Sequence, residues 1–166
     1  QGLEVSGALN LGNVWAPLDG LGMLGSVSFT ESDLNPALPG QTVRIAGLSG
    51  TVYNITGYYE RGGFQARISK RFRKAFKGDV VQLFATRGET EILDDEQIDA
   101  QIGYTFEQGP LEGLGVLFQV NNLTNSPYRT RLGLDSGGTT TADGGSLPET
   151  YEEYGRQFLF GVNYRF

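Results

Sequence analysis

Apolar and polar residues alternate over long stretches of this chain. The pattern is clearest in the ten residues from Gln157 to Phe166, where every second position is apolar or aromatic and the positions between are mostly polar or small. Because a β-strand sends successive side chains to opposite faces, one face of this predicted strand is apolar and the other mostly polar. The apolar set is Phe158, Phe160, Val162, Tyr164 and Phe166.

The same alternation recurs in six further segments, and the helical spacing i, i+3, i+4 is absent from them. It predicts an all-β, antiparallel, up-and-down fold. The predicted strands are residues 2–12, 21–31, 48–60, 64–76, 92–107, 113–124 and 151–166. In the most regular of them, QIDAQIGYTF, the apolar set is Ile98, Ala100, Ile102, Tyr104 and Phe106.

The predicted connections alternate in length. Three are short turns, whereas residues 32–47, 77–91 and 129–150 are long and rich in Gly, Thr, Ser, Pro and acidic residues. Outer-membrane β-barrels have short periplasmic turns and long extracellular loops, so the alternation favours a transmembrane barrel. Residues 134–149 are expected to be flexible from their composition.

A short repeat occurs in two of the predicted turns. PLDGLGML, residues 17–24, returns as PLEGLGVL, residues 110–117. Proline fixes φ and glycine takes positive-φ positions, so shared turn chemistry is favoured over a duplicated unit.

The polar set of the strands suits a water-filled interior better than a solvent-exposed outer face. It mixes charged and amide side chains with Gly and Ser, whereas aromatic residues lie near both ends of the apolar faces, as in membrane girdles. The candidates for facing the lumen of a barrel are Arg67, Arg71, Arg73, Asp99, Gln101, Gln119, Asn121 and Asn163. A soluble β-sheet core stays open as an alternative.

Composition excludes several classes of function. The 166 residues contain no Cys and no His, which removes disulfides, thiolate metal sites and Ser-His-Asp triads. A net charge of −6 argues against a nucleic-acid partner. No run of about 18 apolar residues occurs, and the first residues lack the pattern of a signal peptide. No enzyme, cofactor or metal is expected, because the one acidic cluster, at residues 94–96, lies beside a single strand.

Four stretches, in this order, resemble the C-terminal third of TonB-dependent outer-membrane receptors. They are TVYNITGYYERGGFQARISKRFR, QIDAQIGYTF, LFQVNNLTNSPYRT and YEEYGRQFLFGVNYRF. The resemblance implies that residues 1–166 are about seven strands of a 22-stranded barrel whose plug domain and earlier strands are absent here. Alone, they are expected to form an open curved sheet with residues 2–12 and 151–166 at its edges.

The resemblance also implies a function and a location. The complete protein would take up a scarce ligand of carbohydrate or siderophore type across the outer membrane of a Gram-negative bacterium. It would use energy from the TonB system, passed through the missing plug. The five apolar residues of the last strand match the signal that the barrel-assembly machinery recognises.

Two local features remain to be placed. In RISKRFRKAFK the three arginines are expected to pair with carboxylates of DDEQIDA across the ladder. Lys74, with Lys70, could contact lipopolysaccharide phosphates. Lys70 falls on the apolar face, which requires either a position high in the outer leaflet or a bulge that shifts the register. In NNLTNSPY a rim bulge is expected, with Pro127 ending the pairing.

Two other functions stay open. The chain could be a small, self-contained outer-membrane barrel that serves as an anchor or adhesin. It could also be a soluble β-barrel that binds a small apolar ligand.

Overall fold

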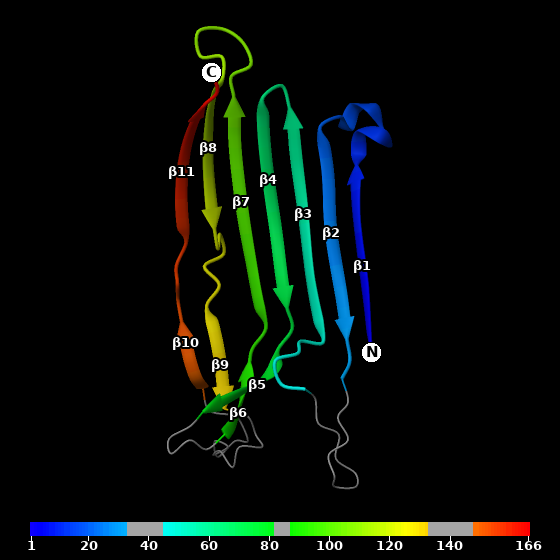
Figure 1. The fold of residues 1–166 in the computed structure, drawn as a ribbon, viewed down its shortest axis with the longest axis vertical. Coiled ribbons are helices and arrows are strands. Elements are labelled where there is room, and N and C mark those ends of the chain that lie inside the picture. Colours follow the sequence, from blue (N-terminus) through cyan, green and yellow to red (C-terminus); the bar gives the residue numbers. More distant parts are fainter. Residues whose placement is uncertain (33–44, 82–86, 133–147) are drawn as a thin grey trace.

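The computed structural model describes residues 1–32, 45–81, 87–132 and 148–166, and these residues are almost entirely β-structure (Figure 1). Seven strands form one antiparallel sheet in the order β1-β2-β3-β4-β7-β8-β11. Their bounds are β1 Gly2–Asn10, β2 Leu21–Thr30, β3 Thr51–Arg61, β4 Phe64–Arg73, β7 Asp95–Thr105, β8 Leu114–Asn121 and β11 Gln157–Tyr164. Two short 3-10 helices, η1 (Leu11–Asn13) and η2 (Ala16–Leu18), connect β1 to β2.

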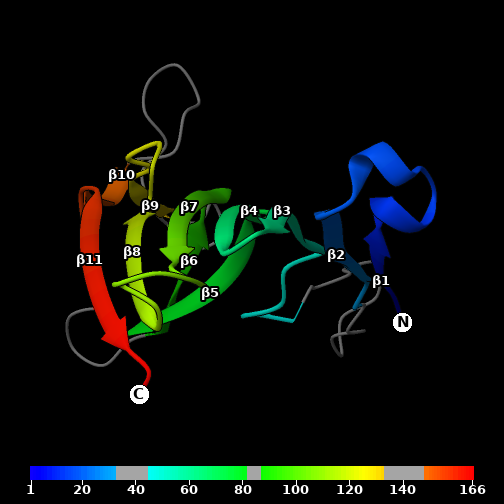
Figure 2. The same ribbon diagram turned by 90° about the horizontal axis from the view of Figure 1, so that it is seen from above.

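The seven strands predicted from alternation are confirmed, and so is the open sheet. Figure 2 shows the strands in one curved row with β1 and β11 at its ends. One boundary is corrected: the predicted strand 151–166 is two strands, because residues 153–156 leave the ladder and Gly155 has a φ of 76°.

A second, four-stranded sheet was not predicted. Its order is β10-β9-β6-β5, and it extends the ends of β11, β8, β7 and β4 on the side away from the short turns (Figure 1). Its strands are β5 Phe76–Val81, β6 Arg87–Ile92, β9 Tyr128–Leu132 and β10 Pro148–Glu152. The expectation that residues 77–91 and 129–150 are only loops is therefore wrong. Residues 134–147 of the segment expected to be flexible lie outside the described residues.

Polar side-chain contacts link neighbouring strands of the second sheet. Arg131 donates from Nε to Glu91 at 2.5 Å, and Thr130 donates to Glu149 at 3.2 Å. Because residues of β6 and β9 are mostly charged or hydroxylated, the alternation of apolar positions that reveals a half-buried strand is weak there.

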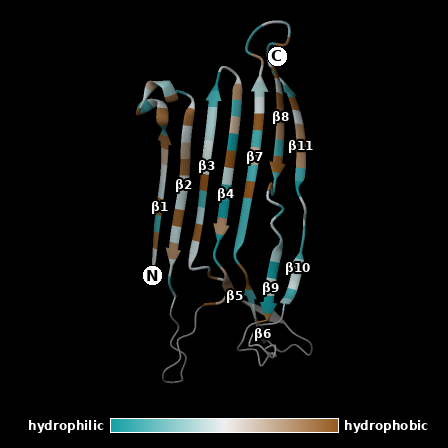
Figure 3. Cartoon of the chain, turned by 180° about the vertical axis from the view of Figure 1, so that it is seen from behind, coloured by the Kyte–Doolittle hydropathy of each residue, from teal (hydrophilic) through white to brown (hydrophobic). Residues whose placement is uncertain are grey.

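The register aligns the apolar residues of all seven strands on one face. A single row across the sheet has an apolar residue or glycine at every step, and this row is Leu9, Met23, Gly57, Ile68, Ala100, Val120 and Phe158. A row on the opposite face is Gly22, Tyr58, Arg67, Gln101, Gln119 and Leu159. Figure 3 shows the resulting alternation of hydrophobic and hydrophilic bands along the strands.

The apolar face has no second layer over it within the described residues. Val120, at 7% exposure, is the one buried hydrophobic residue in this part of the chain, whereas Phe160 is 73% exposed and Ile55 50% exposed. A sheet in a soluble domain buries one face against another element, so this face requires some other cover. None of the described helices has the length and hydropathy needed to span a bilayer.

Candidate functional site

The polar face carries hydrogen bonds between side chains of neighbouring strands. The Asn54 amide donates to the Ser26 hydroxyl at 2.7 Å, and the hydroxyls of Thr56 and Ser69 lie 2.8 Å apart. These pairs link β2, β3 and β4, so hydrogen bonds between neighbouring strands hold these polar side chains in place.

Two of the three arginines on this face form the expected ion pairs with β7. Arg71 lies 3.6 Å from Asp99 and also donates to the Gln97 side chain, and Arg73 lies 3.8 Å from Asp95. Arg67 stands opposite Gln101 and forms no ion pair with any described residue. It is the arginine of β4 that stays available to another group.

The amide candidates share the polar face with these arginines. Gln101 is paired in register with Arg67 on one side and Gln119 on the other. Gln119 donates from Nε2 to Asn121 Oδ1 at 2.7 Å. Asn163 lies over Gly115: a Cβ added at Gly115 would be 2.1 Å from the side-chain oxygen of Asn163. The eight predicted residues therefore lie on one face, spread over β4, β7, β8 and β11.

Asn122, which the sequence predicted only as part of the rim bulge in NNLTNSPY, is hydrogen-bonded to β7, to the turn after β8 and to the segment before β11. It is 6% exposed and has a φ of 53°. Its backbone N–H donates to Asp99 at 2.9 Å, and its amide group donates to the carbonyls of Ser126 and Gly155 at 3.2 Å. Asp99 is thus a cap for the turn after β8 as well as the partner of Arg71.

The expected rim bulge in NNLTNSPY is confirmed by the pairing around Asn122. Val120 pairs with Ala100, whereas Leu123 donates to the carbonyl of Ile98 at 2.7 Å, so β8 has one residue more than β7 over this stretch. The expectation that Pro127 ends the pairing is wrong: β8 already ends at Asn121, and pairing resumes at Tyr128, directly after Pro127.

Lys70 lies on the apolar face in an unbroken register, so the proposed bulge at this position is wrong. β4 pairs continuously with β3 and β7 from Phe64 to Arg73. Lys70 forms an ion pair with Glu96 at 2.9 Å on the same face. Alternation alone did not reveal this pair, although Glu96 occupies the same set of positions as Ile98.

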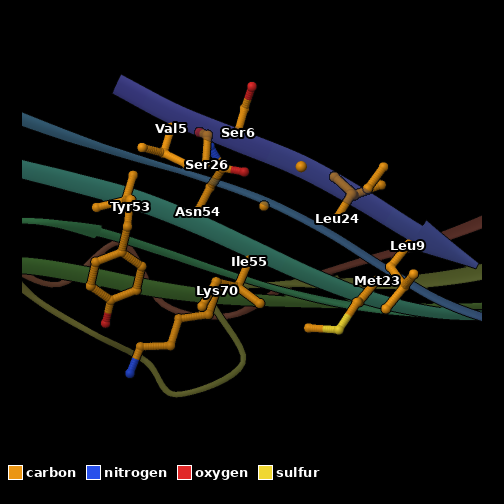
Figure 4. Close-up of a pocket in the computed structure, with 14 residues that line it drawn as sticks. Val5, Ser6, Leu9, Met23, Leu24, Ser26, Tyr53, Asn54, Ile55 and Lys70 are labelled. Atoms are coloured by element: carbon orange, nitrogen blue, oxygen red, sulfur yellow. The ribbon is translucent and has the colours of Figure 1, made fainter. Parts of the chain in front are cut away.

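An open apolar trough of about 840 Å³ lies beside Lys70 on β1, β2 and β3. Its floor includes Gly7 and Gly25, which face each other across the ladder. Figure 4 shows Met23, Ile55 and Lys70 on the same side of the sheet, with Ser6 on the other.

The terminal strand exposes its apolar set. Phe158 stacks on Phe118 with ring centroids 6.3 Å apart, and Tyr164 meets Phe166 edge to face at 5.0 Å. All five residues of this set are exposed. Nothing within the described residues covers them.

Outside the main sheet, two tyrosines are coupled to carboxylates. Tyr151 donates to Glu153 at 2.7 Å, and this hydrogen bond raises the pKa of the Tyr151 hydroxyl. Glu152 raises the pKa of Tyr154 in the same way. No group of three or more His, Cys, Asp and Glu side chains that could hold a metal occurs in the part of the chain that is described.

Comparisons with known proteins agree with this geometry. No protein-family model and no curated protein sequence matches the chain. A crystal structure of the ferric citrate transporter FecA, in the unliganded form, matches with a TM-score of 0.67 and 16% sequence identity. The chain has the fold of part of that transporter. The match covers 97% of this chain and 23% of FecA, a TonB-dependent outer-membrane receptor, so the chain spans about a quarter of FecA.

Proposed function

We propose that this chain is the C-terminal section of an outer-membrane β-barrel belonging to a TonB-dependent uptake receptor. One observation carries the proposal: a register-aligned apolar face runs across all seven strands, and no described residue covers it. In an outer-membrane barrel, lipid covers that face and the polar face lines the interior. A soluble barrel that binds a small apolar ligand would instead bury this face around its ligand.

Crowding supports the assignment of the polar face to the interior. Side chains converge on the concave face of a curved sheet, so glycines are needed there beneath longer neighbours. Three polar-face glycines would place a Cβ within 3 Å of a side chain from the next strand: Gly22 under Tyr58, Gly103 under Gln65, and Gly115 under Asn163. On the apolar face, nothing lies within 4 Å of a Cβ at Gly7.

Strand direction favours a larger barrel over a self-contained one. Because neighbours in the sheet are antiparallel, the first and seventh strands, β1 and β11, run parallel to each other. Outer-membrane barrels of bacteria pair antiparallel strands, so closure of this sheet requires an odd number of further strands. An anchor or adhesin made of these seven strands alone is disfavoured.

The whole receptor would carry a scarce ligand inward with TonB-transmitted energy through a plug domain outside this chain. A polar face rich in Arg, Gln and Asn suits a hydrogen-bonding ligand of carbohydrate or siderophore type. Arg67 is the best placed side chain to meet an anionic group on the ligand or plug. Recognition of the last strand by the barrel-assembly machinery, and contact of Lys74 with lipopolysaccharide, belong to the same proposal.

The absence of cysteine from the chain allows a direct test with single-cysteine variants. Gln101→Cys and Ile102→Cys are adjacent in β7 but on opposite faces. In the membrane-embedded protein we expect a water-soluble maleimide to label the Gln101→Cys variant. The Ile102→Cys variant should react only after denaturation, because hydrocarbon excludes the reagent.

Two outcomes would contradict the proposal. Equal labelling of both variants before denaturation would indicate that neither face is covered by lipid. The reverse pattern would place the polar face outward.

A further inference from the structure

The connection between β1 and β2 exposes two large apolar side chains in an ordered turn. Val14 is 70% exposed and Trp15 62% exposed. Their backbone N–H groups both donate to the carbonyl of Leu11 at 3.0 Å, and Asn10 caps the first 3-10 helix through a bond to Gly12 at 2.9 Å. Such exposure on an ordered turn marks an interaction surface rather than a frayed loop.

The other strand ends at this side of the sheet differ. Contacting aromatic rings lie on the apolar face in the β3–β4 hairpin (Tyr59 with Phe64), at the end of β7 (Tyr104 with Phe106) and at the end of β11 (Tyr164 with Phe166). The ends of β1 and β2 have no aromatic residue there, since Leu9, Leu21 and Met23 occupy the equivalent face. Trp15, in the connection between η1 and η2, is the one aromatic residue that the β1–β2 hairpin itself carries at this end.

We propose that Trp15 and Val14 form an anchor that inserts into the lipid headgroup region at the short-turn end of the barrel. The anchor completes the aromatic belt where the strands themselves lack aromatic residues. This inference rests on the proposed function, because it requires the apolar face to lie in a membrane. Figure 2 shows the blue segment between β1 and β2 standing to one side of the row of strands.

Charge specifies the kind of lipid surface. The first 32 residues contain no Lys or Arg, and Asp19 is the one charged residue between β1 and β2. Attraction to anionic lipid, which strengthens many interfacial segments, is therefore absent. Indole rings favour the headgroup level of a bilayer whatever its charge. Because this segment has no basic side chain that anionic lipid would attract, we take its partner to be a zwitterionic phospholipid surface.

Trp15 is the sole tryptophan of these 166 residues. In the complete receptor, with any tryptophan outside this chain replaced by phenylalanine, intrinsic fluorescence reports on Trp15 alone. The protein would be placed in zwitterionic bilayers whose acyl chains carry bromine near the carbonyl end or near the methyl end. We expect bromine near the carbonyl end to remove roughly half or more of the emission, and bromine near the methyl end to remove less, because the indole lies at headgroup level.

Two control variants separate this inference from the proposed function. In a Trp15→Phe background, Phe160→Trp places the probe on the apolar face of β11 and Tyr58→Trp places it on the polar face. We expect the probe at residue 160 to be quenched most by bromine near the methyl end, and the probe at residue 58 by neither lipid.

Quenching at residue 160 without quenching of Trp15 would overturn the anchor and leave the barrel intact. Absence of quenching at residue 160 would overturn both. A requirement for anionic lipid would overturn the assignment to a zwitterionic surface.

Discussion

Two glycines explain the short repeat at the scale of single residues. Gly20 and Gly113 occupy equivalent positions in the two copies and have φ values of 88° and 84°. A Cβ would lie 2.7 Å from the carbonyl oxygen of Glu60 in the first turn and 2.3 Å from that of Arg165 in the second. The repeat therefore encodes a turn that closes onto the neighbouring strand, which supports shared turn chemistry.

Gly109 provides a matched comparison for Gly113, because both lie in the β7–β8 turn with positive φ. Nothing lies within 4 Å of a Cβ at Gly109, where φ is 87°. We expect Gly109→Ala to cost about 1–2 kcal/mol of unfolding free energy, from left-handed strain alone. Gly113→Ala should cost clearly more, because the Arg165 carbonyl must also move. Urea unfolding in bilayers measures both, and equal losses would contradict the steric argument.

The ion pair on the apolar face makes a second residue-scale prediction. Removing Lys70 as Lys70→Met leaves the Glu96 carboxylate unpaired beside Ile98 and Phe72, on the face that lipid covers under the proposed function. The double variant Lys70→Met/Glu96→Leu leaves no charge there. We expect the single variant to unfold more easily in bilayers than the double variant. If water covered this face, the single and double variants should unfold with similar ease. Equal stability of the two variants would therefore argue against a lipid-covered face.

At the scale of elements, the molecule is two sheets joined at breaks in four long strands. Asn122 lies at the joint between β8 and β9, and its amide reaches Gly155 in the joint between β10 and β11. Through Asp99 it also connects to β7 and to Arg71. These contacts fix the position of the four-stranded sheet relative to the seven-stranded sheet.

Asn122→Gly should weaken this joint without straining the backbone, because glycine accepts the φ of 53°. Loss of the side-chain bonds is expected to cost about 1–3 kcal/mol, since the Ser126 N–H and the Gly155 carbonyl lose a partner. Hydrogen exchange should rise at residues 122–127 and 153–156. Unchanged exchange there would show that Asn122 does not hold the joint.

Asn122→Ala is the matched variant. It loses the same bonds and adds left-handed strain of about 1–2 kcal/mol. It should therefore be less stable than Asn122→Gly.

At the scale of the whole molecule, the proposed function gives the last strand two roles, packing and recognition during assembly, which can be separated. Phe166 is fully exposed and touches Tyr164, so its loss removes one ring from an exposed face. Even full burial of a Phe side chain is worth only about 1.5–3 kcal/mol, which a large barrel tolerates. Under the proposed function, recognition by the assembly machinery would precede folding and would depend on the terminal residue itself.

Deletion of Phe166 in the complete receptor should therefore reduce outer-membrane abundance much more than it reduces the stability of protein refolded in detergent. Cell fractionation measures the first quantity, and heat-modifiable gel mobility measures the second. Comparable losses in both assays would indicate that Phe166 acts only through packing.

The sequence alone determined the seven main strands and which residues share each face. Alternation with a period of two is a local property, and strands such as β7 and β11 display it over most of their length. The positions of Lys70 on the apolar face and of Arg71 and Asp99 on the other followed directly. Shared faces and the rim bulge after Val120 were therefore predictable.

Tertiary structure decided which of these residues meet. Register between strands that are distant in sequence determines three features: the partner of Lys70, the position of Asn122 and the pairing of the four-stranded sheet. Arg131 and Glu91 are 40 residues apart, and their pairing stabilises strands that have no apolar stripe. Such polar pairs form only when the ladder brings the two side chains within hydrogen-bonding distance. No periodicity in the sequence therefore predicts them.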